Sequence, residues 1–340
     1  MVALADIFKA RDTIEGVVIR TPMVPSPFLS ELAGTDFLLK LETIQPIGAF
    51  KLRGAANAVF SLPDSVKGVT CCSTGNHGRG VAYAARARGI RAIVCMSSLV
   101  PQTKIDGIRA LGAQVRIAGA SQDDALAESL RLCETEGLTE ISPFDDPLVI
   151  AGQGTIGLEA MEDRPDLDTV LVPLSGGGLA GGIAAAVKAV NPKTRVIGIT
   201  MDRGAAMHES IAAGHPVEVA EVASLADSLG GGIGLDNRLS FALCRDLLDD
   251  TILVTEEEIY RAMQTLYYED RIVTEGASAV GVAALQSGKL GKVSGPVAAI
   301  ISGRNVDMSV FTRIVNGQDV TLGETTIRGQ TYGKGETRGA

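Results

Sequence analysis

From residue 68 to residue 136, short apolar segments alternate regularly with helix-like segments. Strands are expected at 68–72, 92–96 and 114–117, and helices are expected to follow them at 78–88, 104–111 and 121–136. A strand, a crossing helix and a second strand at this spacing form right-handed βαβ units with parallel strands. The sequence therefore predicts an α/β fold with open parallel sheets.

A second α/β series follows an interruption that is rich in proline and glycine. Residues 143–154 (PFDDPLVIAGQG) break the alternation, and we expect the chain to cross back between two domains near 143–147. Further strands are expected at 169–174, 195–200 and 297–301, with helices at 179–190, 205–213, 239–248, 256–269 and 276–286. We predict a large domain from 1–64 plus 144–318, a small domain from 65–143, and a loose C-terminal tail at 319–340.

Length, charge and cysteine use narrow the class of protein. A chain of 340 residues exceeds one typical core, which agrees with two domains. The net charge of −9 argues against nucleic acid or an anionic membrane as a partner. The 5 cysteines include no C-x-x-C pair, which is typical of reduced intracellular proteins, and no apolar run reaches the length of a membrane span. We expect a soluble, cytoplasmic protein.

One glycine-rich loop predicts a phosphate site. Ser175-Gly176-Gly177-Gly178-Leu179 follows an apolar strand and opens a helix, where free N–H groups and the helix dipole favour an anion. The loop has a second interpretation, because Gly176, Gly178 and Gly181 also fit the dinucleotide pattern, with Asp202 after the next strand. That pattern would make the protein a nicotinamide-dependent dehydrogenase.

A second loop and one lysine indicate a small anionic ligand. Ser73-Thr74-Gly75-Asn76-His77 also joins a strand to a helix, and it suits either a bound carboxylate or an ordinary helix cap. Lys51 lies between Phe50 and Leu52, which favours desolvation and a lowered pKa, although a lysine at a helix start can also extend into solvent. Together, two anion loops and a desolvated lysine suit a ligand with an anionic group at each end.

Four motifs in this order resemble those of the fold-type-II pyridoxal-phosphate enzymes, in the branch of threonine dehydratase and serine racemase. They lie at 48–55, 73–77, 175–179 and 302–305, and the resemblance covers about residues 5–318. Arg304 and the Ser-Thr-Gly-Asn-His-Gly-Arg loop are most similar to the hydroxyectoine-utilisation dehydratase group. The resemblance implies a homodimeric enzyme of the tryptophan synthase β-like fold, with pyridoxal 5'-phosphate in the cleft between two α/β domains.

The resemblance also assigns roles toward the cofactor. Lys51 would form the Schiff base and later take the Cα proton, and Phe50 would pack against the ring. Asn76 would bind the ring 3-hydroxyl, and Ser302 would face the pyridine nitrogen. Glu275 would have a supporting role near the cofactor. The phosphate would be held by Ser175, Gly176, Gly177, Gly178 and Leu179.

Further roles concern the substrate. Ser73, Thr74 and His77 would bind the substrate carboxylate. Thr74 stands where racemases of this branch have a serine base, so it keeps a hydroxyl there. Arg304 replaces the glycine of many relatives and would bind a second substrate carboxylate, tune the ring, or turn away to the surface. Residues 200–205 lack the carboxylates of the family's cation site at the matching positions, so no metal is predicted.

The implied reaction is the elimination of water from a β-hydroxy amino acid, which gives a 2-oxo acid and ammonia. Threonine, serine, 3-hydroxyaspartate and a hydroxyectoine-derived hydroxydiamino acid remain open as substrates, because they differ only at the side-chain end. An amino-acid racemase of the same fold is one alternative function. A nicotinamide-dependent dehydrogenase is the other alternative, and it agrees less well with the four motifs.

Overall fold

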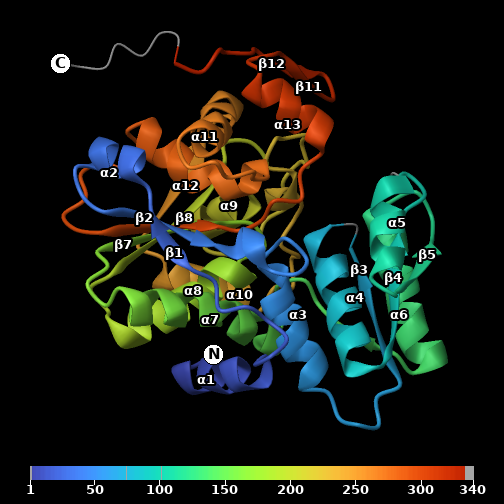
Figure 1. Ribbon diagram of the computed structural model, residues 1–340. Helices are drawn as coiled ribbons and strands as arrows, with labels where there is room; N and C mark the ends of the chain where they lie inside the picture. The colour runs from blue at the N-terminus through green and yellow to red at the C-terminus, as the bar shows by residue number, and fades with distance from the viewer. Residues whose placement is uncertain (1, 74, 101, 334–340) are drawn as a thin grey trace.

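The computed structural model describes residues 2–73, 75–100 and 102–333, and its described part contains two main sheets (Figure 1). The large sheet has six strands in the order β1-β2-β10-β7-β8-β9. In it β1 pairs antiparallel with β2, and the other neighbours are parallel. Its strands are β1 (Met23–Pro25), β2 (Phe37–Leu41), β7 (Thr169–Pro173), β8 (Arg195–Met201), β9 (Asp250–Val254) and β10 (Val297–Ile301).

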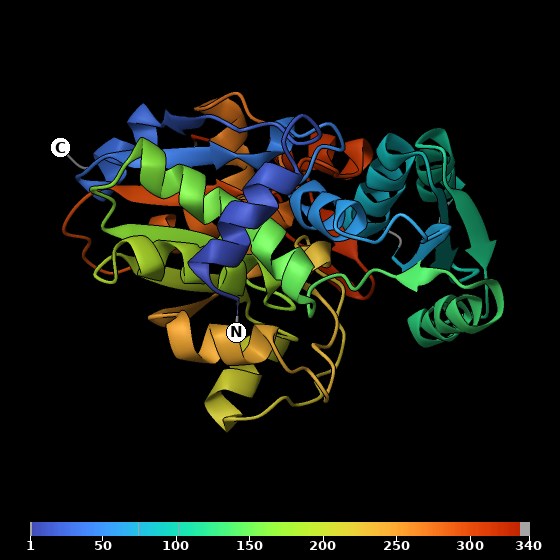
Figure 2. The ribbon, with the colours of Figure 1, turned by 90° about the horizontal axis from the view of Figure 1, so that it is seen from below.

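Helices cover both faces of the large sheet because its central strands are apolar on both sides. On β7, Val170 and Val172 belong to the core cluster on one face, and Leu171 belongs to the cluster on the other. The Leu171 face is covered by α2 (Pro27–Ala33), α11 (Glu256–Tyr268), α12 (Gly276–Gln286) and α13 (Met308–Val315) (Figure 1). The opposite face is covered by α1 (Leu4–Thr13), α7 (Pro147–Asp163), α8 (Gly178–Val190), α9 (Ala206–Ala213) and α10 (Ser240–Leu247), and α1 lies across α7 (Figure 2).

The small sheet has four parallel strands in the order β5-β4-β3-β6. They are β3 (Gly68–Cys72), β4 (Arg91–Met96), β5 (Gln114–Ile117) and β6 (Thr139–Glu140). The helices around it are α3 (Lys51–Phe60), α4 (Asn76–Arg88) and α5 (Gln102–Ala110) on one face and α6 (Gln122–Glu136) on the other. Two 3-10 turns, η1 (Glu42–Ile44) and η2 (Asp227–Leu229), complete the core of the fold. The predicted parallel α/β architecture is therefore confirmed.

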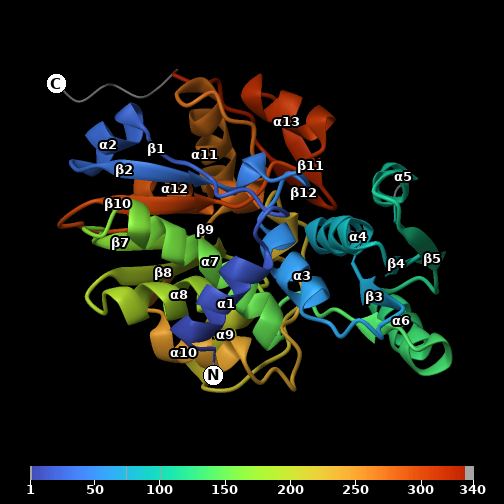
Figure 3. The ribbon, with the colours of Figure 1, turned by 60° about the horizontal axis from the view of Figure 1, so that its bottom comes forward.

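Helix α3 lies between the two sheets, beside α4 on one side and α7 on the other (Figure 3). Glycines make this close approach possible. A Cβ at Gly80 of α4 would lie 3.1 Å from the Ala55 Cβ, and one at Gly152 of α7 would lie 2.6 Å from the Arg53 carbonyl oxygen. Any larger residue at these two positions would push α3 away from its neighbours.

The expectation that residues 143–154 interrupt regular structure is wrong from Pro147 onward. Helix α7 begins there, with proline at a position where its missing N–H costs nothing. Asp146 caps it, because its Oδ1 accepts hydrogen bonds from Leu148 N and Val149 N at 2.8 and 2.9 Å. The glycines that suggested a loop are contact positions of the helix rather than breaks in it.

The expectation of a loose tail is also wrong for residues 320–327. These residues form a hairpin of β11 (Val320–Leu322) and β12 (Thr325–Ile327). Val320 and Ile327 are buried in the same core cluster as α11 and α13, which fixes the hairpin to the body of the protein. Residues 334–340 lie outside the described part of the chain. Among the described helices, none is long and apolar enough to span a membrane.

Candidate active site

The loop before α3 pairs with the segment that follows β10, and this brings Lys51 and Ser302 together. Phe50 N donates to the Ser302 carbonyl oxygen and Arg304 N donates to the Gly48 carbonyl oxygen, both at 2.9 Å. Gly48 has a φ of +76°, which favours glycine, and a Cβ there would lie 2.9 Å from Asn305 Oδ1. The first residue of α3, Lys51, is thereby held at the carboxyl end of the large sheet.

The Lys51 amine lies in a setting where it is easily deprotonated. Its Nζ donates a hydrogen bond to the Pro143 carbonyl oxygen at 2.6 Å and lies 5.4 Å from the centre of the Phe50 ring. Burial lowers the pKa of Lys51 to about 8, and within the described part of the chain no carboxylate forms an ion pair with its amine. A substantial fraction of this amine is therefore neutral near physiological pH.

The glycine-rich loop after β7 forms a cradle that larger residues would fill. A Cβ at Gly176 would lie 2.4 Å from the Phe144 ring, and one at Gly178 would lie 2.8 Å from the Phe144 carbonyl oxygen. Gly177 has a φ of +86°, and Ser240 Oγ donates to the Gly176 carbonyl oxygen at 2.6 Å. Because α8 begins at Gly178, the first-turn N–H groups have no acceptor within the helix and can bind an anion.

The loop before α4 reaches the large sheet through Asn76. Asn76 Nδ2 donates to both carboxylate oxygens of Glu275 at 3.1 Å, and Asn305 Nδ2 donates to Asn76 Oδ1 at 2.6 Å. Ser73 Oγ accepts from Gly75 N at 3.3 Å. Thr74, which sequence analysis singled out, lies outside the described residues. The structure therefore brings Asn76 and the end of β10 together across the two sheets.

Glu275, the N-cap residue of α12, organises this contact. Besides Asn76, it accepts hydrogen bonds from Ser228 Oγ and Asn305 N, each at 3.2 Å. Burial raises the pKa of Glu275, and the hydrogen bond from Asn76 offsets part of that rise. The family resemblance implies a supporting role for Glu275 but none for Ser228 or Asn305. Asn305 lies inside the motif at 302–305, so its place in that motif was the sequence signal that could have pointed to its role.

Ser302 is buried at the end of β10 and has a serine partner that sequence analysis did not assign. Its Oγ lies 3.0 Å from Ser278 Oγ. Ser278 Oγ in turn donates to the Gly303 carbonyl oxygen and accepts from Gly303 N, both at 2.7 Å. Because Ser278 already uses its proton on Gly303, it can accept the proton of Ser302, and this fixes the direction of the Ser302 hydroxyl.

Two predicted substrate contacts, His77 and Arg304, differ in exposure: one side chain is buried and the other is exposed. The His77 ring is buried, with its Nε2 at 2.7 Å from the Ile141 carbonyl oxygen. Burial and the nearby Lys51 lower the pKa of His77 to about 3, so the ring is neutral. Arg304 is exposed, and within the described part of the chain its guanidinium has no carboxylate partner. Among the described residues, no group of three or more His, Cys, Asp or Glu could hold a metal ion.

Comparison with known proteins agrees with this geometry. Residues 14–303 match the family described as pyridoxal-phosphate dependent enzyme. The chain belongs to this family. It is 56% identical over 317 residues to a Sinorhizobium fredii protein named provisionally as a threonine dehydratase, a match that covers 93% of this chain and 96% of that protein. It is 40% identical over 322 residues to the catabolic L-threonine dehydratase of Escherichia coli strain K12, covering 94% and 97% of the two chains.

Solved structures give the same result. The structure of maize serine racemase matches with a TM-score of 0.88 and 34% identity, over 92% of this chain and 97% of that one. The fold-type-II fold, the pyridoxal-phosphate cofactor and the enzyme class of ammonia-lyase are therefore confirmed. The dehydrogenase alternative for Gly176, Gly178 and Gly181 is wrong, because these glycines lie in the matched region of a pyridoxal-phosphate family.

Proposed function

We propose that the protein eliminates water from a β-hydroxy amino acid of the threonine or serine type and releases a 2-oxo acid and ammonia. The observation that carries this proposal is the amine of Lys51. Its pKa is lowered to about 8, and its helix begins where the chain pairs with the buried Ser302. Threonine dehydratases among the relatives support the same reaction.

The residues present fit pyridoxal phosphate. The glycine cradle at 176–178, which a Cβ would fill, and the N-terminal turn of α8 suit its phosphate, with Ser175 and Leu179 at the edges. Lys51 would form the Schiff base and Phe50 would contact the ring. Asn76 would bind the ring 3-hydroxyl and Ser302 would face the pyridine nitrogen. The bound cofactor supplies an electron sink that stabilises negative charge at the substrate Cα.

The protein's own groups perform the proton transfer. The Lys51 amine would take the Cα proton of the substrate, and its lowered pKa keeps a useful fraction of it neutral for that role. The proton gained by Lys51 is then available to the hydroxyl that leaves as water. Pro143, whose carbonyl oxygen accepts from Lys51 Nζ, limits where that amine can point.

The substrate carboxylate is proposed to bind at the start of α4. The first-turn N–H groups of α4, which begins at Asn76, have no acceptor within the helix and favour an anion there. We propose that His77 contributes its main-chain N–H, because its ring is neutral and already contacts Ile141. Ser73 and Thr74 would add hydroxyl groups from the preceding loop.

The choice of substrate rests on finer features. The 40% identity to a threonine dehydratase supports threonine. We also propose two further substrates. The exposed Arg304 can bind the second carboxylate of 3-hydroxyaspartate, and the resemblance of the Arg304 motif and the Ser73–Arg79 loop to the hydroxyectoine-utilisation group supports a hydroxyectoine-derived hydroxydiamino acid. Initial rates with threonine, serine, 3-hydroxyaspartate and that hydroxydiamino acid, repeated with Arg304→Gly, test this. If Arg304 has no part in selection, all four rates will change by the same factor.

Racemisation is the second candidate function, supported by the similarity to maize serine racemase. A second base would have to stand on the opposite face of the substrate, and Thr74 is the proposed group. Chiral chromatography of serine incubated with the enzyme separates the two activities. Formation of D-serine at a rate comparable with that of the 2-oxo acid would favour the racemase.

We further propose that residues 65–143 close over the substrate, while 1–64 and 144–318 carry the cofactor. The enzyme is proposed to work as a homodimer in the cytoplasm. Its five cysteines include no C-x-x-C pair, which is typical of reduced intracellular proteins and supports that location. Light scattering after size-exclusion chromatography measures the oligomeric state, and a monomeric mass at working concentration would contradict the dimer.

Borohydride reduction followed by peptide mapping tests the core of the proposal. The purified enzyme should absorb visible light, and reduction should leave the cofactor mass on Lys51. Lys51→Ala should keep the fold but lose turnover of every hydroxy amino acid. Lys67→Ala, which removes an exposed lysine directly before β3, should leave turnover unchanged. A cofactor adduct on another residue, or retained elimination by Lys51→Ala, would refute the proposal.

A further inference from the structure

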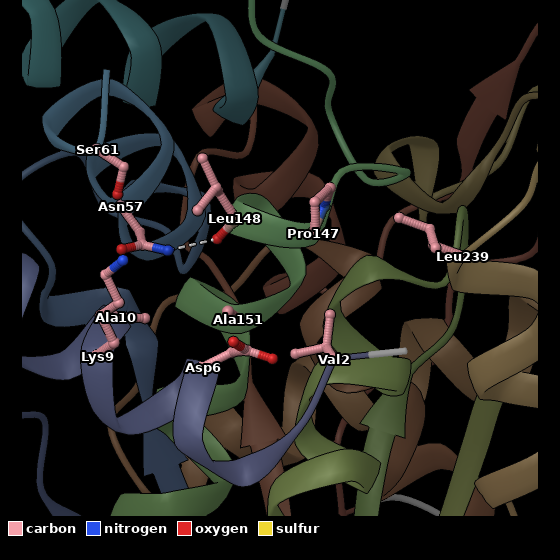
Figure 4. A pocket seen from close by; sticks show the side chains of 10 residues that line it. All are labelled: Val2, Asp6, Lys9, Ala10, Asn57, Ser61, Pro147, Leu148, Ala151 and Leu239. Carbon is pink, nitrogen blue, oxygen red and sulfur yellow. Dashed lines mark hydrogen bonds between the residues drawn. The ribbon is translucent and has the colours of Figure 1, made fainter. Parts of the chain in front are cut away.

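We propose that a cavity outside the cofactor cleft binds a small aliphatic α-amino acid as a second ligand. The cavity has a volume of about 160 Å³ and lies between α1, the C-terminal end of α3 and the N-terminal end of α7 (Figure 4). None of the residues assigned to the cofactor or the substrate lines it. It is therefore a separate place for a ligand.

Most of the wall is apolar. Alkyl groups are contributed by Val2, Ala10, Pro147, Leu148, Ala151 and Leu239. An apolar cavity of about 150 Å³ holds a molecule the size of benzene. A cavity of about 160 Å³ therefore has room for a side chain of three or four carbons. This excludes a nucleotide or a sugar phosphate as the occupant.

The remaining groups form a rim that contains both signs of charge. Asp6 and Lys9 are exposed and lie three residues apart on α1, so they share one helix face. In Figure 4 Lys9 extends along the cavity wall toward Asn57. Asp6 Oδ2 accepts from Ala3 N at 2.8 Å, which leaves its second oxygen for a ligand. A ligand with one charge of each sign matches this rim better than a simple anion, which Asp6 would repel.

Asn57 provides a fixed polar contact inside the cavity. The residue is 2% exposed, and its Nδ2 donates to the Leu148 carbonyl oxygen at 2.7 Å, which sets the direction of its Oδ1. Within the described part of the chain, Asn57 Oδ1, Ser61 Oγ and Lys9 Nζ have no hydrogen-bond partner. An amino acid would satisfy all three. Its carboxylate would accept from Lys9 and Ser61, and its ammonium would donate to Asp6 and Asn57.

The position of the cavity connects it to Lys51. Helix α3 begins at Lys51 and ends beside the cavity, and α7 begins at Pro147, shortly after the Pro143 carbonyl that accepts from Lys51 Nζ. An occupant that contacts Asn57 and Leu148 touches both helices. The bound amino acid would therefore act as an effector on the lysine without entering the cofactor cleft.

The test measures L-norvaline binding by calorimetry to holoenzyme reduced with borohydride, in which the cofactor is fixed to the protein and cannot react with the ligand's amine. We expect one saturable site, with weaker binding of butanoate and of butylamine because each offers only one charge. If mass spectrometry finds no fixed cofactor, the proposed function fails, and the same titration on unreduced protein still decides this proposal. Absence of saturable norvaline binding would overturn it, and butanoate binding as tightly as norvaline would overturn the zwitterion assignment.

Variants assign the binding to this cavity. Lys9→Gln removes a charge-assisted contact and should weaken norvaline roughly tenfold or more. Ala10→Leu should abolish binding by filling the cavity. Lys292→Gln, at an exposed lysine without a partner in the described part of the chain, is the matched control and should bind as the wild type does. Unchanged affinity in Lys9→Gln would place the ligand elsewhere, and that result does not depend on whether the Ala10→Leu protein folds.

Discussion

Replacing Arg53 with methionine is predicted to destabilise the protein far more than the same change at Arg20. Arg53 is 1% exposed, and its guanidinium binds Glu42 through two contacts of 2.8 Å and Glu159 at 2.6 Å. Lys40 binds the other Glu159 oxygen at 2.6 Å, which gives two cations and two anions in one buried network. Burial alone would lower the pKa of Arg53, but Glu42 and Glu159 outweigh it and raise that pKa.

The size of the effect follows from burial rather than from contact geometry. Without Arg53, the buried Glu42 loses the guanidinium that contacts both of its carboxylate oxygens, and breaking a buried pair in this way costs about 3–5 kcal/mol. Arg20 has equally short contacts, 2.6 Å to both Glu162 and Asp163, but its side chain is 50% exposed. An exposed pair contributes about 0–1 kcal/mol. Urea unfolding of the two variants beside the wild type measures both free energies.

The pH dependence of the Arg53→Met variant provides an independent check. In the wild type, burial alone would raise the pKa of Glu159, but Arg53 and Lys40 outweigh it and lower that pKa. The lowered pKa stabilises the fold above the ordinary pKa of the carboxyl, and this contribution is lost as pH falls. The variant loses the Arg53 part of this contribution, so its gap from wild type should widen as pH rises. Adding Glu42→Gln should close part of that gap at the higher pH. A loss no larger than that of Arg20→Met, or a gap independent of pH, would refute the reasoning.

Three further predictions concern the site. In protein freed of cofactor, the rate of pyridoxal-phosphate attachment, followed by absorbance, should rise with pH and level off above about 8, because the pKa of Lys51 is lowered; a rise that continues past pH 10 would contradict this. Gly176→Ala places a Cβ 2.4 Å from the Phe144 ring, so cofactor affinity in equilibrium dialysis should fall roughly tenfold, and adding Phe144→Ala should restore part of it. Glu275→Ala leaves Asn76 Nδ2 unpaired, so the free energy of unfolding should drop by about 1–3 kcal/mol and turnover should fall, whereas Glu275→Gln should be milder in both assays.

Local patterns in the sequence were sufficient for most of the sheets and their helices. The predicted strands at 68–72, 114–117 and 297–301 coincide with β3, β5 and β10. β3 and β10 are buried along their whole length, whereas β5 is mostly exposed at the edge of the small sheet. Helix α7 could not be found from local patterns, because its early proline and its glycines are turn signals locally. Their actual reason is the close approach of α3, which only tertiary packing creates.

The contacts within the site could not be derived from local patterns either. Asn76 and Glu275 are 199 residues apart in sequence, and Asn305 and Ile47 are 258 apart. The motifs predicted which segments would meet, but not which side chains would bind one another. His77 illustrates the difference, since its position in the loop suggested an anion ligand while its ring faces Ile141.

Gly80 determines how closely α4 packs against the helix that begins with Lys51. Leu52, Ala55 and Val59 of α3 share a core cluster with β3 and β4, so the helix that begins with Lys51 packs with the small sheet as well as with α7. A Cβ at Gly80 would lie 3.2 Å from the Lys51 carbonyl oxygen, so glycine at this position lets α4 pack directly against the backbone of α3. In the proposed closure of residues 65–143, a movement of α4 would therefore be passed to α3 and to the amine of Lys51 at its start. A disulfide placed between α3 and α4 would restrict both movements.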